Sequence, residues 1–463
     1  MIDSNLKIDP KRIHKNLSEK PVVAFMPVIS SLGETIPLIE IARKYEKLGG
    51  KAIFIGLKGM YTDIIINYGF KFIPIEINLN YDFKDTMQIV DQQSDEYHYN
   101  KKKLEDIVFS HFSKNFDRIN DKIVEEEVKK FKKEKVQFIV TGYHLISKIS
   151  AKKANLPIMF IISGVASLSY YKSNYATFPE NYENIITKLI PMSIKNRLIN
   201  KYILRSKMST KDYNRYVKKY NLPKLNHFYE LFRGDYTLFA DDINLLNLKP
   251  QKKLPSEKFI GPIIANKFNI CDNAEIDNKI EKHLCRPGRS ILVSMGSSTA
   301  KNLVIKIIET LNKLEHNAVI AYSRFEKDEK KPEFNNNVIF FETVPSIIKV
   351  NKKVDLAIIH GGRGTVYTAV YSGKPVIGIP MQVEQQYNLD NLVRHKTAIR
   401  LSKKNFSEKK LINAINKIFN NYDKYLDNAQ KLKEKIQKPN GAENAAKIIY
   451  KIVNLKNNSI DNL

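Results

Sequence analysis

The stretch 354–388 constrains the fold more than any other part of the chain. It begins with an apolar run at 354–359, which is typical of a strand buried in a parallel sheet. The glycine-rich turn HGGRG follows at 360–364, and the pattern then predicts a short helix over 365–372. A second apolar strand is predicted over 375–380. This order of strand, turn, helix and strand indicates an α/β domain with parallel strands.

The turn at 360–364 has the chemistry of an anion site. Glycines let a ligand approach the backbone, the N–H groups at the start of a helix point at it, and the helix dipole favours negative charge. Thr365 adds a hydroxyl and Arg363 a cation. The alternative is an ordinary βα turn in which the glycines serve only the bend, since short motifs are often false positives.

The longer pattern HGGRGT, GKPVIGIP and EQQYN resembles the donor-binding stretch of glycosyltransferase family 1 and its bacterial lipid-linked relatives, which have the GT-B fold. The family pattern is HGG-x-(G/N)-(T/S), then G-x-P, then an apolar strand ending in Pro, then (D/E)-Q-x-x-N. The matching residues are His360, Gly361, Gly362, Gly364, Thr365, Gly373, Pro375, Pro380, Glu384, Gln385 and Asn388. The resemblance implies that residues 360–365, Arg363 included, bind the donor diphosphate, and that Glu384 and Gln385 bind the donor sugar.

The N-terminal half alternates strands and helices in a βαβαβ order, which argues for a parallel sheet with right-handed crossovers. Strands are predicted over 21–28, 51–57, 70–77, 136–141 and 157–162, and the last strand of this half over 235–240. Ligands of such sheets bind beyond the carboxyl ends of the strands. This places Ser31, Gly33 and Glu34 at the mouth of the first crevice, in a loop before a helix over 35–48.

Glu34 is the candidate catalytic base. The segment around it resembles the family's opening motif, with matches at Gly33, Pro37, Ala42 and Gly49. Many family members carry a catalytic His where this chain has Glu34, and sterol-type relatives carry an acid there. A carboxylate can take the proton of an acceptor hydroxyl if burial raises its pKa toward neutrality. The alternative is an acid that only complements the helix dipole.

Other positions are expected to complete the site. Ser297 follows the strand predicted at 290–295, where the family has a diphosphate-binding S-x-G-S turn. The nucleoside is expected near Val344, Pro345 and Thr368, where this chain lacks the family's Trp and its ribose-binding Glu. UDP is the commonest nucleotide in the family, with dTDP and GDP open. On the acceptor side, His144 follows a strand, and a surface or satisfied loop histidine is the alternative.

The chain carries a formal net charge of +27, which points to nucleic acid, an anionic membrane or an anionic substrate as a partner. The lysines are dispersed and no nucleic-acid motif accompanies them, so we expect no specific nucleic-acid partner. The segment 184–205 mixes Ile, Leu and Met with basic residues, and Pro191 divides it into two helices. Two alternatives stay open for it: a basic amphipathic helix on an anionic membrane, or a helical pair with its apolar face packed on the N-terminal domain.

The 463 residues are enough for two or three domains. We expect two Rossmann-like domains with parallel sheets facing a cleft. The predicted boundaries are an acceptor-binding domain 1–246, a linker 247–262, a nucleotide-sugar-binding domain 263–440 and a helix 441–463 that crosses back to the first domain.

The resemblance implies an inverting sugar transfer from a nucleotide-diphosphate sugar to an acceptor hydroxyl, with a lipid as one hypothesis for the acceptor. It implies no metal and no cofactor beyond the nucleotide sugar. The alternatives are a non-enzymatic sugar or lipid binder of the same fold, a nucleotide-sugar 2-epimerase and a basic nucleic-acid binder.

The compartment is expected to be the cytoplasm. The polar N-terminus lacks the apolar core of a signal peptide, and no apolar run approaches the roughly 20 residues that span a bilayer. Peripheral attachment to the inner face of the membrane stays open. Cys271 and Cys285 are expected to be ordinary thiols.

Overall fold

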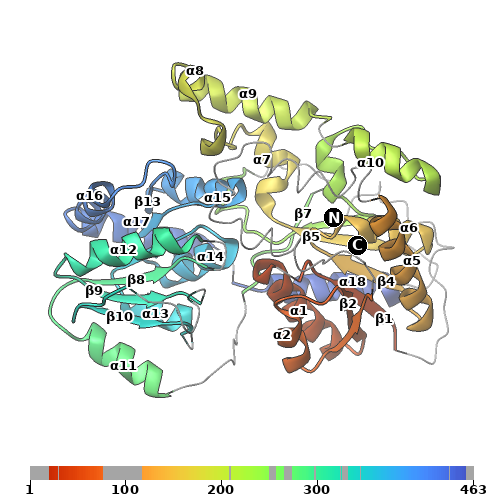
Figure 1. Ribbon diagram of the computed structural model, residues 1–463, viewed down its shortest axis with the longest axis horizontal. Helices are drawn as coiled ribbons and strands as arrows, with labels where there is room; N and C mark the ends of the chain where they lie inside the picture. The colour runs from red at the N-terminus through yellow and green to blue at the C-terminus, as the bar shows by residue number, and fades with distance from the viewer. Residues whose placement is uncertain are drawn as a thin grey trace.

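The computed structural model describes residues 20–29, 31–76, 117–207, 210–249, 257–264, 274–296, 299–323, 325, 332–344, 346–436 and 438–454. Two α/β domains make up this part of the chain, and each is built on one sheet (Figure 1). Every strand pairing within the two sheets is parallel. The predicted fold class, two Rossmann-like domains with parallel sheets, is therefore confirmed.

The N-terminal sheet has the strand order β3-β2-β1-β4-β5-β6-β7. Its strands are β1 (Val22–Met26), β2 (Lys51–Gly56), β3 (Lys71–Pro74), β4 (Phe138–Thr141), β5 (Ile158–Ile162), β6 (Tyr236–Phe239) and β7 (Lys258–Phe259). The strand order reverses between β1 and β4, which is where a doubly wound sheet opens its ligand crevice. The prediction that the strand over 235–240 ends this sheet is wrong, because β7, inside the predicted linker, pairs with β6.

The C-terminal sheet has the order β10-β9-β8-β11-β12-β13. Its strands are β8 (Ser290–Ser294), β9 (Asn317–Ala321), β10 (Val338–Phe341), β11 (Leu356–Ile359), β12 (Val376–Gly378) and β13 (Ala398–Arg400). The reversal here lies between β8 and β11. Both central strands are buried along their whole length, as the continuous apolar runs of a sheet covered on both faces require.

Helices cover both sheets (Figure 1). Those of the N-terminal domain are α1 (Leu32–Lys47), α2 (Thr62–Asn67), α5 (Asp117–Lys133), α6 (Leu145–Lys153), α7 (Leu168–Lys172), α8 (Ile185–Lys188), α9 (Met192–Arg205) and α10 (Thr210–Val217). Those that follow are α11 (Ala274–Leu284), α12 (Lys301–Asn312), α13 (Ile347–Lys353), α14 (Arg363–Ser372), α15 (Val383–Arg394), α16 (Glu408–Phe419), α17 (Tyr422–Lys435) and α18 (Gly441–Asn454). The last helix, α18, lies against α1, and its Ala445, Ala446 and Ile449 belong to the core of the N-terminal domain.

Direct hydrogen bonds join the two domains. The Tyr367 hydroxyl on α14 donates to Asp241 Oδ1 at 2.9 Å and accepts from the backbone N–H of Asp242 at 2.7 Å. On α15, Gln386 Nε2 donates to Thr177 Oγ1 at 2.7 Å and to the Phe178 carbonyl at 3.0 Å. The carboxyl ends of the two sheets are thereby held facing each other. Among the described residues, no helix has both the length and the apolar character needed to cross a membrane.

Candidate functional site

Both sheet reversals contribute residues to one site between the domains. In the N-terminal domain, Glu34 follows β1 and Gly142 follows β4. In the C-terminal domain, Gly296 follows β8 and His360 follows β11. Arg363 of α14 interacts electrostatically with Glu34, so a charged group of the second crevice lies near the acid of the first.

Glu34 lies in the first turn of α1, which begins three residues earlier than predicted. Its Oε1 accepts three backbone hydrogen bonds, from the N–H groups of Val28 at 3.1 Å, Gly142 at 3.1 Å and Tyr143 at 2.9 Å. Burial raises the pKa of this carboxyl to about 7, although the three hydrogen bonds and Arg363 each act to lower it. A carboxylate poised near neutrality can accept a proton from a hydroxyl group. An acid that only complemented the helix dipole would not need to be buried, so that alternative does not explain the position of Glu34.

Gly142 keeps the space that Glu34 occupies. A Cβ at this position would lie 2.7 Å from Cγ, Cδ and Oε1 of Glu34, closer than carbon atoms approach without displacement. We therefore expect Gly142→Ala to shift the carboxyl and to lower kcat by about 10-fold or more, as misplaced catalytic groups do. Neither Gly164→Ala nor Gly69→Ala is a suitable control, because the first would also clash and the second would place a side chain at a strained φ of +84°. The measurement is kcat with the melting temperature of each variant recorded beside it, and an unchanged kcat would contradict the assignment of Glu34.

His360 packs between two glycines. A Cβ on Gly296 or on Gly362 would come within 2.4 Å of the imidazole ring, so only glycine leaves room for it at either position. Burial lowers the pKa of His360 to about 4, and the ring is neutral at physiological pH. Its Nδ1 makes no hydrogen bond of good geometry among the residues that the structure describes, although the Ser294 backbone is near enough to act to raise the imidazole pKa. A buried nitrogen without a partner next to a glycine turn is a candidate contact for a ligand.

The start of α14 is open to a ligand. Gly362 is its N-cap and offers no side-chain capping bond, so the first N–H groups of the helix have no intrahelical partner. A Cβ on Gly364 would meet no atom within 4 Å, which shows free space beside this turn. Thr365 Oγ1 donates to the Gly362 carbonyl at 2.8 Å, so its O–H would have to rotate away from that carbonyl to donate to an anion. The turn thus has the geometry of an anion site.

Arg363 carries the positive charge of the site. Burial acts to lower its pKa, but Asp241 and Glu384 outweigh this effect and raise it. Burial in turn raises the pKa of Asp241 and of Glu384, and Arg363 acts against both increases. With Glu34, three acidic side chains therefore interact electrostatically with one guanidinium group.

Asp241 is a site residue that the sequence analysis missed. It follows β6 and accepts from the Gly164 N–H at 2.6 Å, the Ser163 hydroxyl at 3.2 Å and the Tyr367 hydroxyl. The signal was present in the sequence, since the predicted strand 235–240 is followed at once by two aspartates at the sheet edge that already held Glu34.

The two predicted sugar-binding residues have different settings. Glu384 lies in the first turn of α15; burial raises the pKa of its carboxyl, and Arg363, Ser163 and Asn388 act to lower it. Gln385 Oε1 instead accepts from the Met381 N–H at 2.8 Å, so it caps the turn before α15. Asn388 Nδ2 donates to the Gly361 carbonyl at 3.1 Å. The spacing within EQQYN therefore also serves to fasten α15 to the glycine turn.

The other predicted residues lie on the acceptor side, on the nucleoside side or outside the described residues. Ser31 and Gly33 are at the start of α1, beside Glu34. Val344 is half-buried after β10, and Thr368 is buried one turn into α14, where it donates to the Thr365 carbonyl at 2.8 Å. Ser297 and Pro345 lie outside the described residues.

His144 is held by the fold. It is the N-cap of α6, its Nδ1 accepts from the Ser147 N–H at 3.1 Å, and its Nε2 lies 3.3 Å from the buried Glu127. Both ring nitrogens are used within the N-terminal domain. This is the setting of the satisfied loop histidine that the sequence left as an alternative. Across the described ranges, no three His, Cys, Asp or Glu side chains are grouped so that they could hold a metal ion.

Comparison with known protein families gives a match within the C-terminal half of the chain. Residues 290–447 match the model of the glycosyltransferase family 28 C-terminal domain. Among proteins of similar sequence, human 2-hydroxyacylsphingosine 1-beta-galactosyltransferase is 26% identical over 229 residues, which are 48% of this chain and 40% of that protein. The UDP-glucuronosyltransferase 2B16 of Oryctolagus cuniculus is 22% identical over 330 residues, 67% of this chain and 61% of that protein. The chain thus spans about two fifths to three fifths of the length of these relatives.

Solved structures resemble nearly the whole of the chain in fold. The glycotransferase of kitacinnamycin superposes with a TM-score of 0.62 at 16% identity and covers 94% of this chain and 99% of its own. The calicheamicin glycosyltransferase CalG4 gives 0.63 at 12% identity, covering 94% and 98%. Spinosyn rhamnosyltransferase SpnG complexed with thymidine diphosphate gives 0.62 at 13% identity, covering 93% and 100%. Together the comparisons support a GT-B glycosyltransferase, and they do not assign it to family 1 specifically.

Proposed function

We propose that this protein transfers a sugar from a nucleotide-diphosphate sugar to an acceptor hydroxyl, with inversion at the anomeric carbon and without a metal ion. The observation that carries the proposal is the pairing of Glu34, whose pKa is about 7, with the open glycine turn of α14 across the domain interface. One group is suited to take a proton and the other to hold an anion. The family match over residues 290–447 supports the donor half of this proposal.

In the proposed reaction, Glu34 accepts the proton of the acceptor hydroxyl as its oxygen attacks the anomeric carbon. The bond from that carbon to the diphosphate oxygen breaks, and the leaving diphosphate keeps the electron pair. The first N–H groups of α14, Thr365, His360 and Arg363 stabilise the developing negative charge. Because these groups supply the positive potential, the proposal needs neither a metal ion nor a cofactor beyond the donor.

Donor recognition is proposed as follows. Glu384 and Asp241 accept hydrogen bonds from sugar hydroxyls, and Gln385 orients the start of α15. We propose that Val344 and Thr368 contact the nucleoside; for Pro345 the same role stays a prediction from the sequence, as does a diphosphate contact for Ser297. The names of the relatives favour UDP, whereas similar solved structures were obtained with thymidine diphosphate. The name of one relative, a galactosyltransferase acting on a hydroxyacylsphingosine, favours a lipid acceptor.

Thermal unfolding against UDP, dTDP, GDP and ADP tests the donor site. A ligand at 100 times its Kd stabilises the native state by about 2.7 kcal/mol. The diphosphate that raises the Tm is therefore the one that binds. We expect one of the four to act at submillimolar concentration. Thr365→Ala should lower the affinity for that diphosphate about fivefold, as expected for the loss of one hydrogen bond.

Thr310→Ala is the matched control, because Thr310 Oγ1 also donates to a backbone carbonyl, that of Lys306 at 2.7 Å, but on α12. It should change the Tm of the free protein and leave the shift caused by the diphosphate unaltered. If no diphosphate raises the Tm at millimolar concentration, or if both variants weaken binding equally, the donor-site proposal fails.

A further inference from the structure

Helices α8 and α9 turn their apolar side chains toward solvent. Seven large apolar residues of this segment are exposed, with relative exposures from 49 to 83%: Ile185, Ile186, Leu189, Met192, Ile194, Leu198 and Tyr202. They are most of the large exposed apolar residues in the described part of the chain, where only Met60, Ile66 and Val393 join them. Apolar exposure concentrated on one element marks an interaction surface. We call the exposed face of residues 185–207 the α8–α9 surface.

The fully buried side chains of α9 are polar. Its two buried residues are Lys195, 4% exposed, and Asn200, 1% exposed. The Asn200 amide donates to the Ala176 carbonyl at 2.6 Å and accepts from the Ala176 N–H at 3.2 Å, and Asn196 accepts from the Phe178 N–H at 2.8 Å. These bonds fix the orientation of α9. The alternative in which the apolar face packs on the N-terminal domain therefore holds only in part: Ile199, Ile203 and Leu204 are half-buried, whereas the larger set of apolar residues named above faces solvent. Polar side chains take the fully buried positions, where the backbone groups of segment 176–178 bind them.

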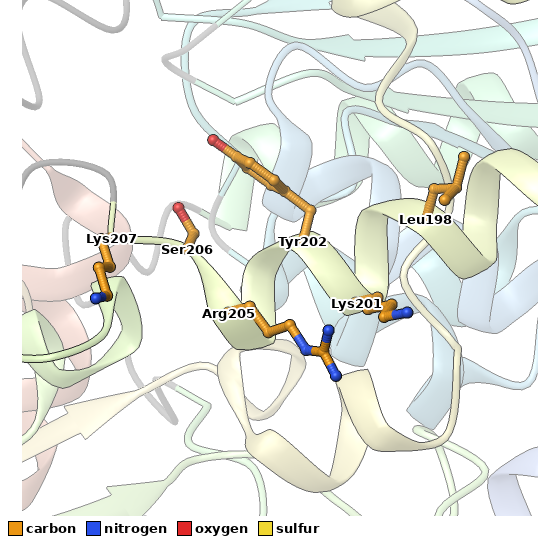
Figure 2. A pocket seen from close by; sticks show the side chains of 6 residues that line it. All are labelled: Leu198, Lys201, Tyr202, Arg205, Ser206 and Lys207. Carbon is orange, nitrogen blue, oxygen red and sulfur yellow. The ribbon is translucent and has the colours of Figure 1, made fainter.

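The same surface is strongly basic. Between residues 184 and 207 the chain has six Lys and Arg residues and no Asp or Glu. Five of the six are exposed, namely Lys188, Arg197, Lys201, Arg205 and Lys207. A surface hollow of about 690 Å³ is lined only by α9 and the two residues after it. Figure 2 shows Leu198 and Tyr202 on one side of the helix and Lys201 and Arg205 on another.

We propose that the α8–α9 surface docks on an anionic phospholipid bilayer. Apolar side chains at helix tips and sides enter the boundary between headgroups and acyl chains, while neighbouring Lys and Arg side chains bind lipid phosphates. Charge complementarity favours this partner over a second copy of the chain, because two such surfaces would bring like charges together. A nucleic acid would satisfy the cations but leave the apolar side chains in water.

Docking would bring the bilayer to the edge of the cleft. Segment 176–178 bonds to α9 on one side and to Gln386 of α15 on the other. Glu384 lies in the first turn of that same helix. Access of a membrane lipid to the site is a consequence that rests on the proposed glycosyl transfer, whereas the docking itself does not.

A single tryptophan can report docking, because the chain contains none. Leu198→Trp places the fluorophore on the α8–α9 surface, and Ile66→Trp places a matched one on α2, where Ile66 is 52% exposed. With vesicles of phosphatidylcholine and phosphatidylglycerol at 0.05 M salt, we expect the emission of Leu198→Trp to shift to the blue and brominated lipid to quench it. The emission of Ile66→Trp should stay unchanged.

The contribution of charge is tested in the full chain by vesicle flotation. Each Lys or Arg near an anionic membrane strengthens binding about fivefold, so Arg197→Gln/Lys201→Gln/Arg205→Gln should bind roughly 100-fold more weakly. The matched control removes three exposed lysines from α16 and α17: Lys409→Gln/Lys417→Gln/Lys424→Gln. It lowers the net charge by the same amount and should bind as the unaltered protein does.

Several outcomes would overturn the proposal. These are no flotation with anionic vesicles, equal loss in the two triple variants, or flotation without a blue shift of Leu198→Trp. A blue shift that depends on protein concentration in the absence of vesicles would assign the surface to a second copy. None of these measurements uses sugar transfer, so failure of docking and failure of the proposed function are distinguishable.

Discussion

Glu34→Gln is expected to lower kcat by a factor of about 10³, within the range for removal of a general base. Glutamine keeps the size of the side chain, and its carbonyl oxygen can accept the three backbone N–H groups that now bind Oε1. It cannot take a proton from an acceptor hydroxyl. The nucleoside diphosphate that raises the Tm should therefore bind the variant within about twofold of its original affinity. Equal kcat in the two proteins would remove Glu34 from the reaction.

The pH dependence of kcat/KM follows from the same carboxyl. The base must be ionised, and burial raises its pKa to about 7, so kcat/KM should rise with pH through about 7 and level off above about 8. The rise should disappear in Glu34→Gln. A stability measurement separates chemistry from folding in this variant.

A carboxyl whose pKa is raised from 4.5 to about 7 stabilises the native state below pH 4.5 and loses that contribution as the pH rises to 7. Glu34→Gln should consequently match the unaltered protein in free energy of unfolding near pH 4 and exceed it by up to about 3 kcal/mol at pH 8. Urea unfolding at the two pH values is the measurement. A variant destabilised at both would mean that the carboxylate is needed for folding, and its lost activity would then say little about catalysis.

The strands could be predicted because a parallel sheet covered on both faces leaves a continuous apolar run for each strand. The run predicted over 51–57 is observed as β2, Lys51–Gly56, and that over 157–162 as β5, Ile158–Ile162. The two-residue strand β7 escaped prediction because Lys258 and Phe259 have no periodicity, and only the open edge of β6 makes them a strand. Helix α1 begins before the predicted start, at an N-cap, Ser31, whose residue type favours that position although its side chain makes no cap bond.

Site residues could be predicted where their function depends on the local backbone. They could not be predicted where their function depends on a side chain far away in the sequence. The glycine turn at 360–364 is such a local feature. By contrast, Gly142, Gly164 and Asp241 matter only through side chains more than 70 residues away in the sequence. The same limit applies to α9: its composition is that of an ordinary amphipathic helix, and only the bonds of Asn196 and Asn200 to residues 176–178 decide which side faces the protein.

Arg363→Met is expected to lower kcat/KM about 300-fold, in the range seen when a group that stabilises developing negative charge is removed. The guanidinium lies at the first position of α14 and is the cation that faces Asp241, Glu384 and Glu34. Without it, the diphosphate loses a charge-assisted contact and the acidic side chains lose their counter-charge. Steady-state rates over a range of donor concentrations, with diphosphate affinity from thermal shifts, are the measurement.

The pH profile shows whether Arg363 acts as the structure implies. Since Arg363 lowers the pKa of Glu34, its removal should move the rise of kcat/KM to higher pH. Arg363→Lys keeps the charge but not the paired N–H donors, so it should restore the original midpoint and only part of the affinity. A midpoint that stays the same in Arg363→Met, together with unchanged affinity, would confine Arg363 to a structural pairing with Asp241 and Glu384. A shifted midpoint would instead mean that Arg363 couples the two domains, because this one side chain would both bind the anion in the C-terminal domain and set the pKa of the base in the N-terminal domain.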